Sequence, residues 1–344
     1  MLLDKVLYSY NDIMIMPSKI SDVVSRTQCI PYDENGMLPI FTSPMSTIID
    51  EKNYQLFKDN NIYPILPRNI DIQTRRQFLY NGEWVAYSLN SFHETFCNEY
   101  DSKKYTNKVR VVIDVANGHM KNLYDSVKYA KELHGDNLVI MTGNIANPYT
   151  YINAYEAGVD YIRCSIGAGS GCITSTQVGI HYGVASLINN IYRVKKELQR
   201  TSDIEGKKLP YIVADGGIRG YSDVIKALAL GADYVMIGSL FAQMKESCAK
   251  TIITKEGKRK VFYGMASYDG QKDLRVEETK VPEGTVKYLP PIGSVCVWKT
   301  KMESYLKSAM SYTNVKDLQH FCPEFVDCVV VSKSVQDSIN KTEF

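Results

Sequence analysis

Residues 161–174 read YIRCSIGAGSGCIT, and this stretch shows how the chain is built. It begins as a mostly apolar run in which Arg163 is the one charged member. Such a run is typical of a strand that is covered on both faces. It opens into Gly167–Gly171, where three glycines in five residues allow positive φ angles and turn backbone groups toward a ligand or ion. Cys172 and Thr174 follow directly, so a thiol and a hydroxyl are delivered to the end of a buried strand.

A glycine-rich turn with a packed cysteine is the simplest interpretation of this loop, because free cysteines are usually small buried side chains. A dinucleotide-binding loop is excluded, since Cys172 stands where the third glycine of G-x-G-x-x-G would fall. Whether the loop carries chemistry therefore depends on what the rest of the chain places beside it.

Seven further strand-like segments occur along the chain, most of them separated by helical patterns. With the first, they are Leu38–Ser43, Ile62–Leu66, Trp84–Leu89, Val109–Val115, Leu138–Thr142, Tyr161–Ser165, Tyr211–Ala214 and Tyr234–Ile237. Lys121–Leu133 has the apolar spacing of an amphipathic helix, and Val184–Leu198 is also expected to be helical. Eight β–α repeats predict a (β/α)8 TIM barrel, with a doubly wound open sheet as the alternative.

The placement of polar residues and glycines favours the barrel. Asp114, Gly143-Asn144, Gly167–Cys172, Asp215-Gly216-Gly217 and Gly238-Ser239 all lie at or just past the carboxyl end of a proposed strand. Barrel enzymes keep their active sites at that end. We therefore predict an α/β protein with a TIM-barrel active site.

The predicted organisation is a single catalytic domain over residues 1–344. Residues 1–37 form an irregular segment before the barrel, and residues 301–344 a helix followed by a surface tail. Residues 250–300 are rich in Lys, Glu, Gly and Pro, which is typical of a mobile flap or lid or of a disordered arm. No separate regulatory domain is evident in the sequence.

Composition narrows the function classes. The formal net charge is +2, so no global electrostatic attraction to nucleic acid or to an anionic membrane is expected. The amino terminus lacks the apolar core of a signal peptide, and no apolar run approaches transmembrane length. The eight cysteines have neither a disulfide rhythm nor a C-x-x-C pair, so we expect reduced thiols, a cytoplasmic protein and no zinc site.

Several strand-end residues suggest nucleotide chemistry. Asp215 could accept hydrogen bonds from two ribose hydroxyls, and the turn at Gly238-Ser239 could bind phosphate, although ordinary turn chemistry explains both. His119 by itself indicates nothing, and Glu283 would by itself be a solvated glutamate. A thiol beside a hydroxyl, a carboxylate on a flap, a phosphate loop and a ribose-binding aspartate together suggest covalent catalysis on a nucleotide.

Six segments resemble the IMP dehydrogenase and GMP reductase family over nearly the whole chain. They are Tyr10–Pro17, similar to F-D-D-V-L-L-x-P; Thr42–Thr47, similar to S-P-M-D-T but with Ser46 in place of Asp; the catalytic loop Gly167–Thr174; the D-G-G-I loop Ala214–Ile218; the phosphate loop Ala232–Ala242; and the purine loop Phe262–Ser267. Any one alone would be weak, but together they are highly specific.

The resemblance implies roles for the matching residues. Cys172 would attack C2 of the purine, and Thr174 and Glu283 would handle the protons of the leaving group or of water. The nucleotide is expected to contact Ser43, Met45, Asp215, Gly216, Gly217, Gly238, Ser239, Gly264, Met265 and Ala266. The nicotinamide cofactor is expected near Asp114, Ala116, Asn117, Gly143 and Asn144, and the carbonyls of Gly167, Gly169 and Cys172 fall where family members can bind potassium.

The reductase branch is favoured by three features. Asp114–Gly118 reads D-V-A-N-G and Phe262–Met265 reads F-Y-G-M, both spellings of the reductase. The Arg-Tyr pair with which the dehydrogenase activates water is absent between Ser267 and Val281, where Arg275 has no Tyr beside it. The resemblance thus implies reduction of GMP to IMP and ammonia with NADPH, by a homotetramer.

Other features leave alternatives open. The spelling V-P-E-G around Glu283 is dehydrogenase-like, and Ser46, Gly171 and Ile180–Gly183 depart from both branches. One alternative is IMP dehydrogenase, which converts IMP to XMP with NAD. Another is a divergent member acting on a different purine nucleotide, and a third is a catalytically silent nucleotide-binding protein.

Overall fold

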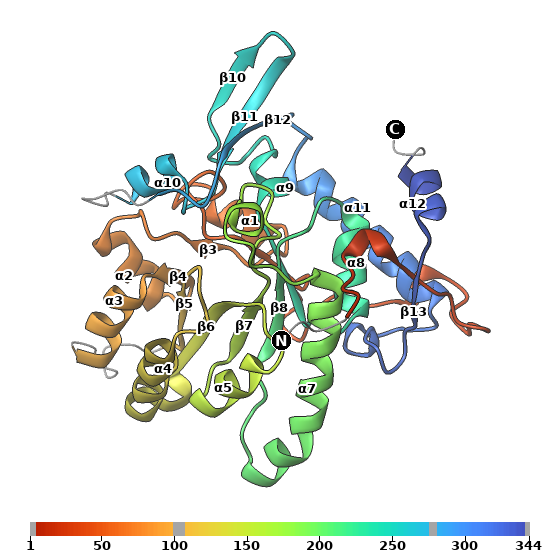
Figure 1. Ribbon diagram of the computed structural model, residues 1–344, viewed down its shortest axis with the longest axis horizontal. Coiled ribbons are helices and arrows are strands. Elements are labelled where there is room, and N and C mark those ends of the chain that lie inside the picture. The colour runs from red at the N-terminus through yellow and green to blue at the C-terminus, as the bar shows by residue number, and fades with distance from the viewer. Residues whose placement is uncertain (1–4, 99–106, 275–280, 341–344) are drawn as a thin grey trace.

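The computed structural model describes residues 5–98, 107–274 and 281–340. Its centre is a sheet of eight parallel strands with helices around it (Figure 1). In chain order the strands are β2 (Ile40–Thr42), β3 (Ile65–Leu66), β4 (Trp84–Tyr87), β5 (Val109–Ile113), β6 (Leu138–Ile145), β7 (Tyr161–Cys164), β8 (Tyr211–Asp215) and β9 (Tyr234–Ile237). All eight predicted strands are confirmed; β9 has the predicted bounds, and the others differ at one or both ends by one to three positions.

The two ends of this sheet meet, which closes the barrel. Strand β2 pairs with β9, where Ile40 lies opposite Val235. On its other side β2 bridges to Tyr63, just before β3: the Tyr63 amide donates to the Ile40 carbonyl at 2.9 Å, and the Thr42 amide donates to the Tyr63 carbonyl at 2.9 Å. A doubly wound sheet would keep two open edges. The TIM-barrel prediction is therefore confirmed.

The barrel interior is filled by side chains from alternate positions of its strands. Phe41, Val112, Tyr234 and Met236 belong to one buried cluster, and Phe41 lies 5.2 Å from Tyr234 between ring centroids. Because side chains alternate across a strand, the residue two positions further on faces the same way. For Val112 of β5 that residue is Asp114, so polar groups follow one layer above an apolar floor.

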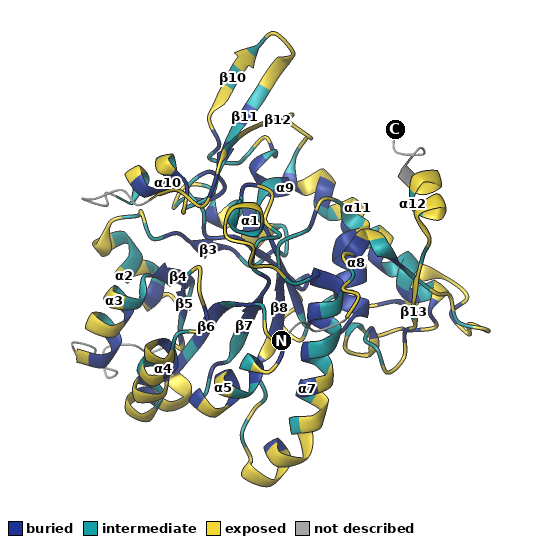
Figure 2. Cartoon of the chain, viewed as in Figure 1, coloured by how far each residue is buried: buried dark blue, intermediate teal, exposed yellow. Residues whose placement is uncertain are grey.

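The helices around the barrel are α1 (Tyr54–Asp59), α2 (Ile72–Tyr80), α3 (Leu89–His93), α4 (Lys121–His134), α5 (Thr150–Ala157), α6 (Thr174–Gln177), α7 (Val184–Glu205), α8 (Tyr221–Ala229) and α9 (Ser239–Ala242). The longer helices, such as α4 and α7, bury one face and expose the other, whereas α8 is mostly buried (Figure 2). A π-helical turn, Glu94–Asn98, follows α3. The predicted helices are confirmed, and α7 runs seven residues beyond the prediction before Gly206 ends it with a φ of 63°.

Residues 250–300 are mostly regular structure, so the disordered arm is wrong for the described part. Strands β10 (Thr251–Thr254), β11 (Gly257–Tyr263) and β12 (Val286–Leu289) form an antiparallel sheet that projects from the barrel (Figure 1). Helix α10 (Tyr268–Asp273) lies beside it. Lys255, Glu256 and Lys258 are exposed at the β10–β11 turn and the start of β11, whereas Lys260 is buried and donates to the Lys245 and Ala249 carbonyls at 3.5 and 3.3 Å. Arg275 and the rest of 275–280 lie outside the described residues.

The two ends of the chain pack against each other. Strand β1 (Ile13–Ile15) pairs antiparallel with β13 (Cys328–Val330), so part of the expected surface tail is hydrogen-bonded strand. The remaining elements are helices α11 (Val295–Tyr312) and α12 (Lys333–Asn340) and the 3-10 turns Tyr10–Asp12, Arg26–Gln28, Gly135–Asn137 and Leu318–His320. Helix α11 begins before residue 301, where the predicted C-terminal segment starts, and ends at Tyr312.

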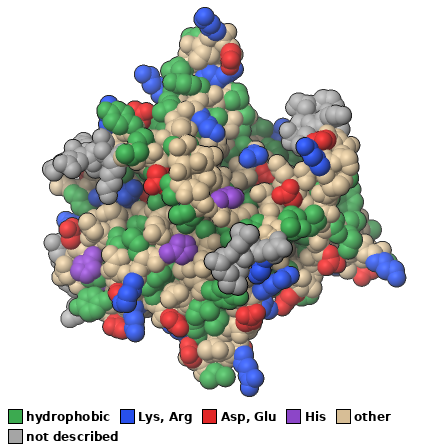
Figure 3. All heavy atoms as spheres, viewed as in Figure 1, with side chains coloured by type: hydrophobic (Ala, Val, Ile, Leu, Met, Phe, Trp, Pro, Cys, Tyr) green, Lys and Arg blue, Asp and Glu red, His purple; other side chains and the backbone are tan. Residues whose placement is uncertain are grey.

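The surface agrees with the low net charge. On the face shown in Figure 3, basic and acidic side chains are interspersed. Among the described helices, none combines the length and the apolar character that crossing a membrane requires.

Candidate active site

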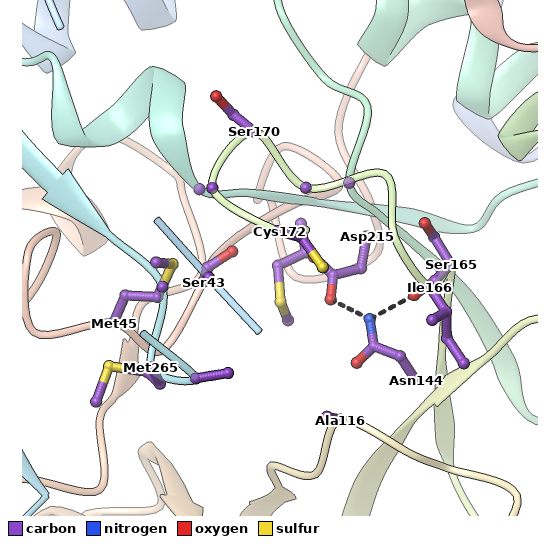
Figure 4. A pocket seen from close by; sticks show the side chains of 18 of the residues that line it. Ser43, Met45, Ala116, Asn144, Ser165, Ile166, Ser170, Cys172, Asp215 and Met265 are labelled. Atoms are coloured by element: carbon purple, nitrogen blue, oxygen red, sulfur yellow. Dashed lines mark hydrogen bonds between the residues drawn. The ribbon is translucent and has the colours of Figure 1, made fainter. Parts of the chain in front are cut away.

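A cavity of about 310 Å³ lies at the carboxyl ends of the barrel strands. Most of the predicted site residues line it: Ser43, Met45, Asp114, Ala116, Asn144, Gly167, Gly169, Cys172, Thr174, Asp215, Gly216, Gly217, Gly238, Ser239, Gly264, Met265, Ala266 and Glu283. Asn117 and Gly143 are not among the lining residues. Figure 4 shows the side chains of Cys172, Asp215 and Asn144 around the same space.

The thiol of Cys172 begins a line of hydrogen bonds. Its Sγ donates to Thr174 Oγ1 at 3.2 Å, and Thr174 Oγ1 donates to Glu283 Oε2 at 2.7 Å. Cys172 and Thr174 are half-buried, whereas Glu283 is exposed. A proton on the thiol therefore has a path through a hydroxyl to a carboxylate that contacts solvent.

Backbone pairing holds Glu283 beside the catalytic loop. The Ile173 amide donates to the Glu283 carbonyl at 3.0 Å, and the Thr285 amide donates to the Gly171 carbonyl at 2.9 Å. Gly171 allows this approach, because a Cβ on it would lie 3.2 Å from the Phe262 ring and 3.4 Å from the Thr285 carbonyl.

The carbonyls predicted to bind potassium are partly engaged within the loop. Gly167 O accepts from Ser175 Oγ at 3.1 Å, and Gly169 O accepts from the Cys172 amide at 3.0 Å. Each carbonyl keeps a second lone pair. Among the described residues, the Cys172 carbonyl accepts no hydrogen bond. Three backbone oxygens from one loop are thus compatible with a monovalent cation, although they would supply only part of its coordination.

A buried charge network lies beneath the cavity. Arg163 Nη1 donates to Asp114 Oδ1 at 2.8 Å, while its Nε and Nη2 donate to Asp215 Oδ2 at 3.0 and 2.9 Å. Asp114 also pairs with Arg68 at 3.1 Å. Burial works against these charges, but Arg68 and Arg163 outweigh it and lower the pKa of Asp114. Burial likewise opposes the charge of Arg163, and the two carboxylates outweigh it and raise the pKa of Arg163.

This network changes the setting of the predicted ribose carboxylate. Asp215 Oδ2 also accepts from Asn144 Nδ2 at 2.7 Å, and the same amide donates to the Ser165 carbonyl at 3.0 Å (Figure 4). Among the described residues, Asp215 Oδ1 accepts no hydrogen bond. One oxygen of Asp215 is thus fixed by the protein, and the other is left for a ligand.

Sequence reasoning missed the role of Arg163 and Arg68. Arg163 is 7% exposed, and a charge inside an apolar strand must find a partner. That rule could have linked it to the carboxylates at neighbouring strand ends. Arg68 follows β3 by two residues, so its place at a strand end was also readable. Asn144, expected near the cofactor, instead contacts the predicted ribose carboxylate.

Asn117 and His119 form structural contacts in the loop after β5. Asn117 Oδ1 accepts from the His119 amide at 3.0 Å. His119 Nε2 accepts from the Ala146 amide at 3.0 Å, and its Nδ1 lies 3.0 Å from Thr150 Oγ1. His119 therefore joins the loops that follow β5 and β6. Burial lowers the pKa of His119 and so favours the neutral ring, and the Ala146 amide that donates to Nε2 places the ring proton on Nδ1.

At two positions near the cavity the structure explains why the residue is glycine. A Cβ on Gly143 would lie 2.4 Å from the Arg163 carbonyl, so a side chain there would displace the strand that carries the network. Gly217 has a φ of 75°, and its amide donates to the Ala168 carbonyl at 3.1 Å. The amide of Gly217 is thus used to join the loops after β7 and β8, while the residue still lines the cavity.

Comparison with known proteins gives the family. A family model described as the IMP dehydrogenase / GMP reductase domain matches residues 104–338. GMP reductase of Staphylococcus epidermidis is 29% identical over 341 residues, covering 96% of this chain and 98% of that protein. GMP reductase of Staphylococcus aureus is 30% identical over 343 residues, with the same coverage. The chain belongs to the IMP dehydrogenase / GMP reductase family and is an oxidoreductase.

Proposed function

We propose that this enzyme reduces GMP to IMP and ammonia, with NADPH as the hydride donor. The observation that carries the proposal is the hydrogen-bonded line from Cys172 through Thr174 to Glu283 at the edge of a cavity that also holds Asp215. The relatives described above carry the name GMP reductase, which supports the choice of reaction.

The covalent step and the proton transfers are assigned to three residues. Thr174 relays the thiol proton to Glu283, and the thiolate of Cys172 adds to C2 of GMP. The same relay returns a proton to the 2-amino group, so the C–N bond breaks and ammonia leaves. When bound, NADPH would supply the hydride that C2 receives. The C–S bond then breaks, which releases IMP and restores the thiolate.

Binding uses the rest of the cavity. Asp215 Oδ1 would accept from the ribose hydroxyls, and Gly217, Gly238, Ser239 and Gly264 would hold the phosphate. Ser43 and Met265 would contact the nucleotide. Asp114 and Ala116 would lie near the cofactor.

We further propose a potassium ion on the carbonyls of Gly167, Gly169 and Cys172. The resemblance also leads us to propose a cytoplasmic homotetramer as the working form of the enzyme.

The test compares two reactions. Parent enzyme with GMP and NADPH should yield IMP and ammonia, whereas IMP with NAD should yield little XMP; the products are separated by chromatography. Dominant XMP formation would instead assign the dehydrogenase, and nucleotide-dependent melting without turnover would assign a binding protein.

A variant tests the relay. Glu283→Gln keeps the shape of the side chain but cannot take a proton, so it should lower the rate of ammonia release far more than it weakens GMP binding. Glu256→Gln is the matched control, since Glu256 is exposed in the turn between β10 and β11. Equal rates for parent and Glu283→Gln would remove Glu283 from the chemistry.

A further inference from the structure

Asp273, the last residue of α10, joins two segments that are distant in the sequence. Its Oδ2 accepts from Ser46 Oγ at 2.5 Å and from the Tyr263 hydroxyl at 2.8 Å. All three residues are half-buried. Burial and the hydrogen bond to Asp273 raise the pKa of Tyr263 to about 12, so this hydroxyl remains a donor at neutral pH.

The loop held by this contact lines the nucleotide cavity. Ser46 lies just after Ser43 and Met45, and Tyr263 lies just before Gly264–Ala266. Helix α10 packs tightly on that loop, because a Cβ on Gly270 would lie 2.4 Å from the Gly264 carbonyl. The carboxylate of Asp273 thus connects the two walls of the cavity without itself lining it.

The same loop also fixes the backbone of Glu283. The Glu283 amide donates to the Ala266 carbonyl at 3.1 Å, and the Glu283 carbonyl accepts from the Ile173 amide at 3.0 Å. Glu283 is therefore suspended between the loop at Ala266 and the catalytic loop. If the loop at Ala266 shifts, the distance from the Glu283 carboxylate to Thr174 changes.

We propose that Asp273 is a positioning residue. By accepting hydrogen bonds from Ser46 and Tyr263, it holds the Gly264–Ala266 loop in the position at which the Glu283 carboxylate accepts the hydrogen bond from Thr174. In the family motif that this region resembles, a carboxylate stands at position 46; here the residue is Ser46, and α10 supplies the carboxylate. The role in turnover rests on the proposed function, whereas the role in ordering the backbone does not.

The first experiment needs no substrate. Hydrogen exchange of the full-length protein is compared for parent, Asp273→Asn and the matched control Asp269→Asn, which makes the same change in the first turn of α10. Weakening two hydrogen bonds to a charged acceptor should speed exchange at the amides of Glu283 and Thr285 by about tenfold or more, with the barrel strands unchanged. Parent-like exchange at these amides in Asp273→Asn would overturn the proposal.

The second experiment uses turnover and a double-mutant cycle. Asp273→Asn should lower kcat by about tenfold to a hundredfold with a smaller change in KM, because misplacing a proton-transfer group affects the reaction more than binding. Tyr263→Phe should lower kcat in the parent but have little further effect in Asp273→Asn. Additive losses in kcat would show that Asp273 and Tyr263 act separately, and would overturn the proposed positioning role.

The two proposals fail in different ways. If parent enzyme does not convert GMP, the proposed function fails, while the exchange comparison still decides whether Asp273 orders Glu283. If parent converts GMP and Asp273→Asn retains parent kcat, the positioning role fails and the function stands. Tyr263→Phe provides the same exchange comparison should Asp273→Asn fold poorly.

Discussion

Replacing Arg163 with methionine would remove the cation that joins Asp114 to Asp215 under the cavity. The change breaks three hydrogen bonds and keeps most of the apolar stem. Asp114 would keep Arg68 and Asp215 would keep Asn144. Removing one partner of a buried pair typically costs about 3–5 kcal/mol, since it leaves charge buried without compensation.

The expected shift in melting temperature follows from the size of the chain. An unfolding entropy of about 2.1 cal/mol/K per residue near 60 °C gives about 0.7 kcal/mol/K for 344 residues. A loss of 3–5 kcal/mol therefore lowers Tm by about 4–7 °C.

Thermal unfolding followed by circular dichroism measures this shift. Arg259→Met is the matched control, because Arg259 pairs with the exposed Glu256 and surface pairs contribute about 0–1 kcal/mol. The control should melt within about 1.5 °C of the parent. If Arg163→Met also melts within that range, the network does not stabilise the fold and our reading of it is wrong.

The pH dependence gives a second check. The folded-state pKa of Asp114 is lowered, so its stabilising contribution is present above the ordinary value of 3.8 and is lost as pH falls through the lower folded value. In Arg163→Met that lowering is weaker. The gap in Tm between parent and variant should therefore be largest near neutral pH and should narrow as pH falls below about 4.

Four further outcomes are expected. Cys172→Ser should retain nucleotide binding but less than about 1% of turnover, or about 2.7 kcal/mol on the transition-state scale; higher activity would exclude the covalent route. Asp215→Asn should weaken binding of a ribonucleotide by about 1.5–3 kcal/mol in calorimetry and of its 2′,3′-dideoxy analogue far less. Ser165→Gly should raise Tm, because Ser165 has a φ of 135° and a buried hydroxyl without a partner among the described residues, and such strain costs about 1–3 kcal/mol. Burial opposes the charge of Glu303, but hydrogen bonds from two lysines and a tyrosine lower its pKa to about 2; the Tm advantage of parent over Glu303→Gln should thus be full above pH 4.5 and fade toward pH 2.

The barrel could be predicted from the sequence because its strands are buried on both faces and therefore appear as apolar runs. Tyr234–Ile237 is apolar throughout, and its bounds match the prediction. Strand ends were less certain: Ile62–Leu66 was predicted, but β3 is only Ile65–Leu66. Tyr63 nevertheless makes the bridge that closes the ring, so the apolar run marked the right place even where regular pairing is short.

The antiparallel pieces were not readable in the same way. Lys255–Lys260 is strongly charged, yet it forms the β10–β11 turn and the first part of β11. Cys328–Val330 became a strand only because β1 lies beside it. In both cases the pairing partner decides the structure, and sequence periodicity carries little information about the partner.

The sequence predicted which residues line the candidate site better than it predicted the hydrogen bonds and ion pairs between them. Asp114 and Asp215 were placed at strand ends, but the ion pairs through Arg163 depend on which residues face the interior. The alternation of side chains along a strand shows which residues face the interior once the strand bounds are known. Tyr161 and Arg163 lie on one face of β7, and Val213 and Asp215 lie on one face of β8. The apolar member of each pair packs on the barrel floor, so the charged member must lie above it.

Gly171 shows how one departure from the family pattern follows from the contacts around it. The carbonyl of Gly171 accepts from the Thr285 amide, and a Cβ on Gly171 would lie 3.2 Å from the Phe262 ring, which is a tight contact. The segment at Glu283–Thr285 pairs with this loop through an isolated antiparallel bridge between Cys172 and Gly284. Below the Gly167–Thr174 loop, the buried Arg163 holds Asp215 by an ion pair, and breaking that pair would leave a charge buried without a partner. Above it, the backbone of Glu283 is held by amides and carbonyls of the two neighbouring loops, and its carboxylate accepts from Thr174 Oγ1; these contacts can separate without leaving a charge buried. The residue proposed to handle protons is thus held by interactions that break easily, so under the proposed function turnover should respond to the contacts of Asp273 more sharply than stability does.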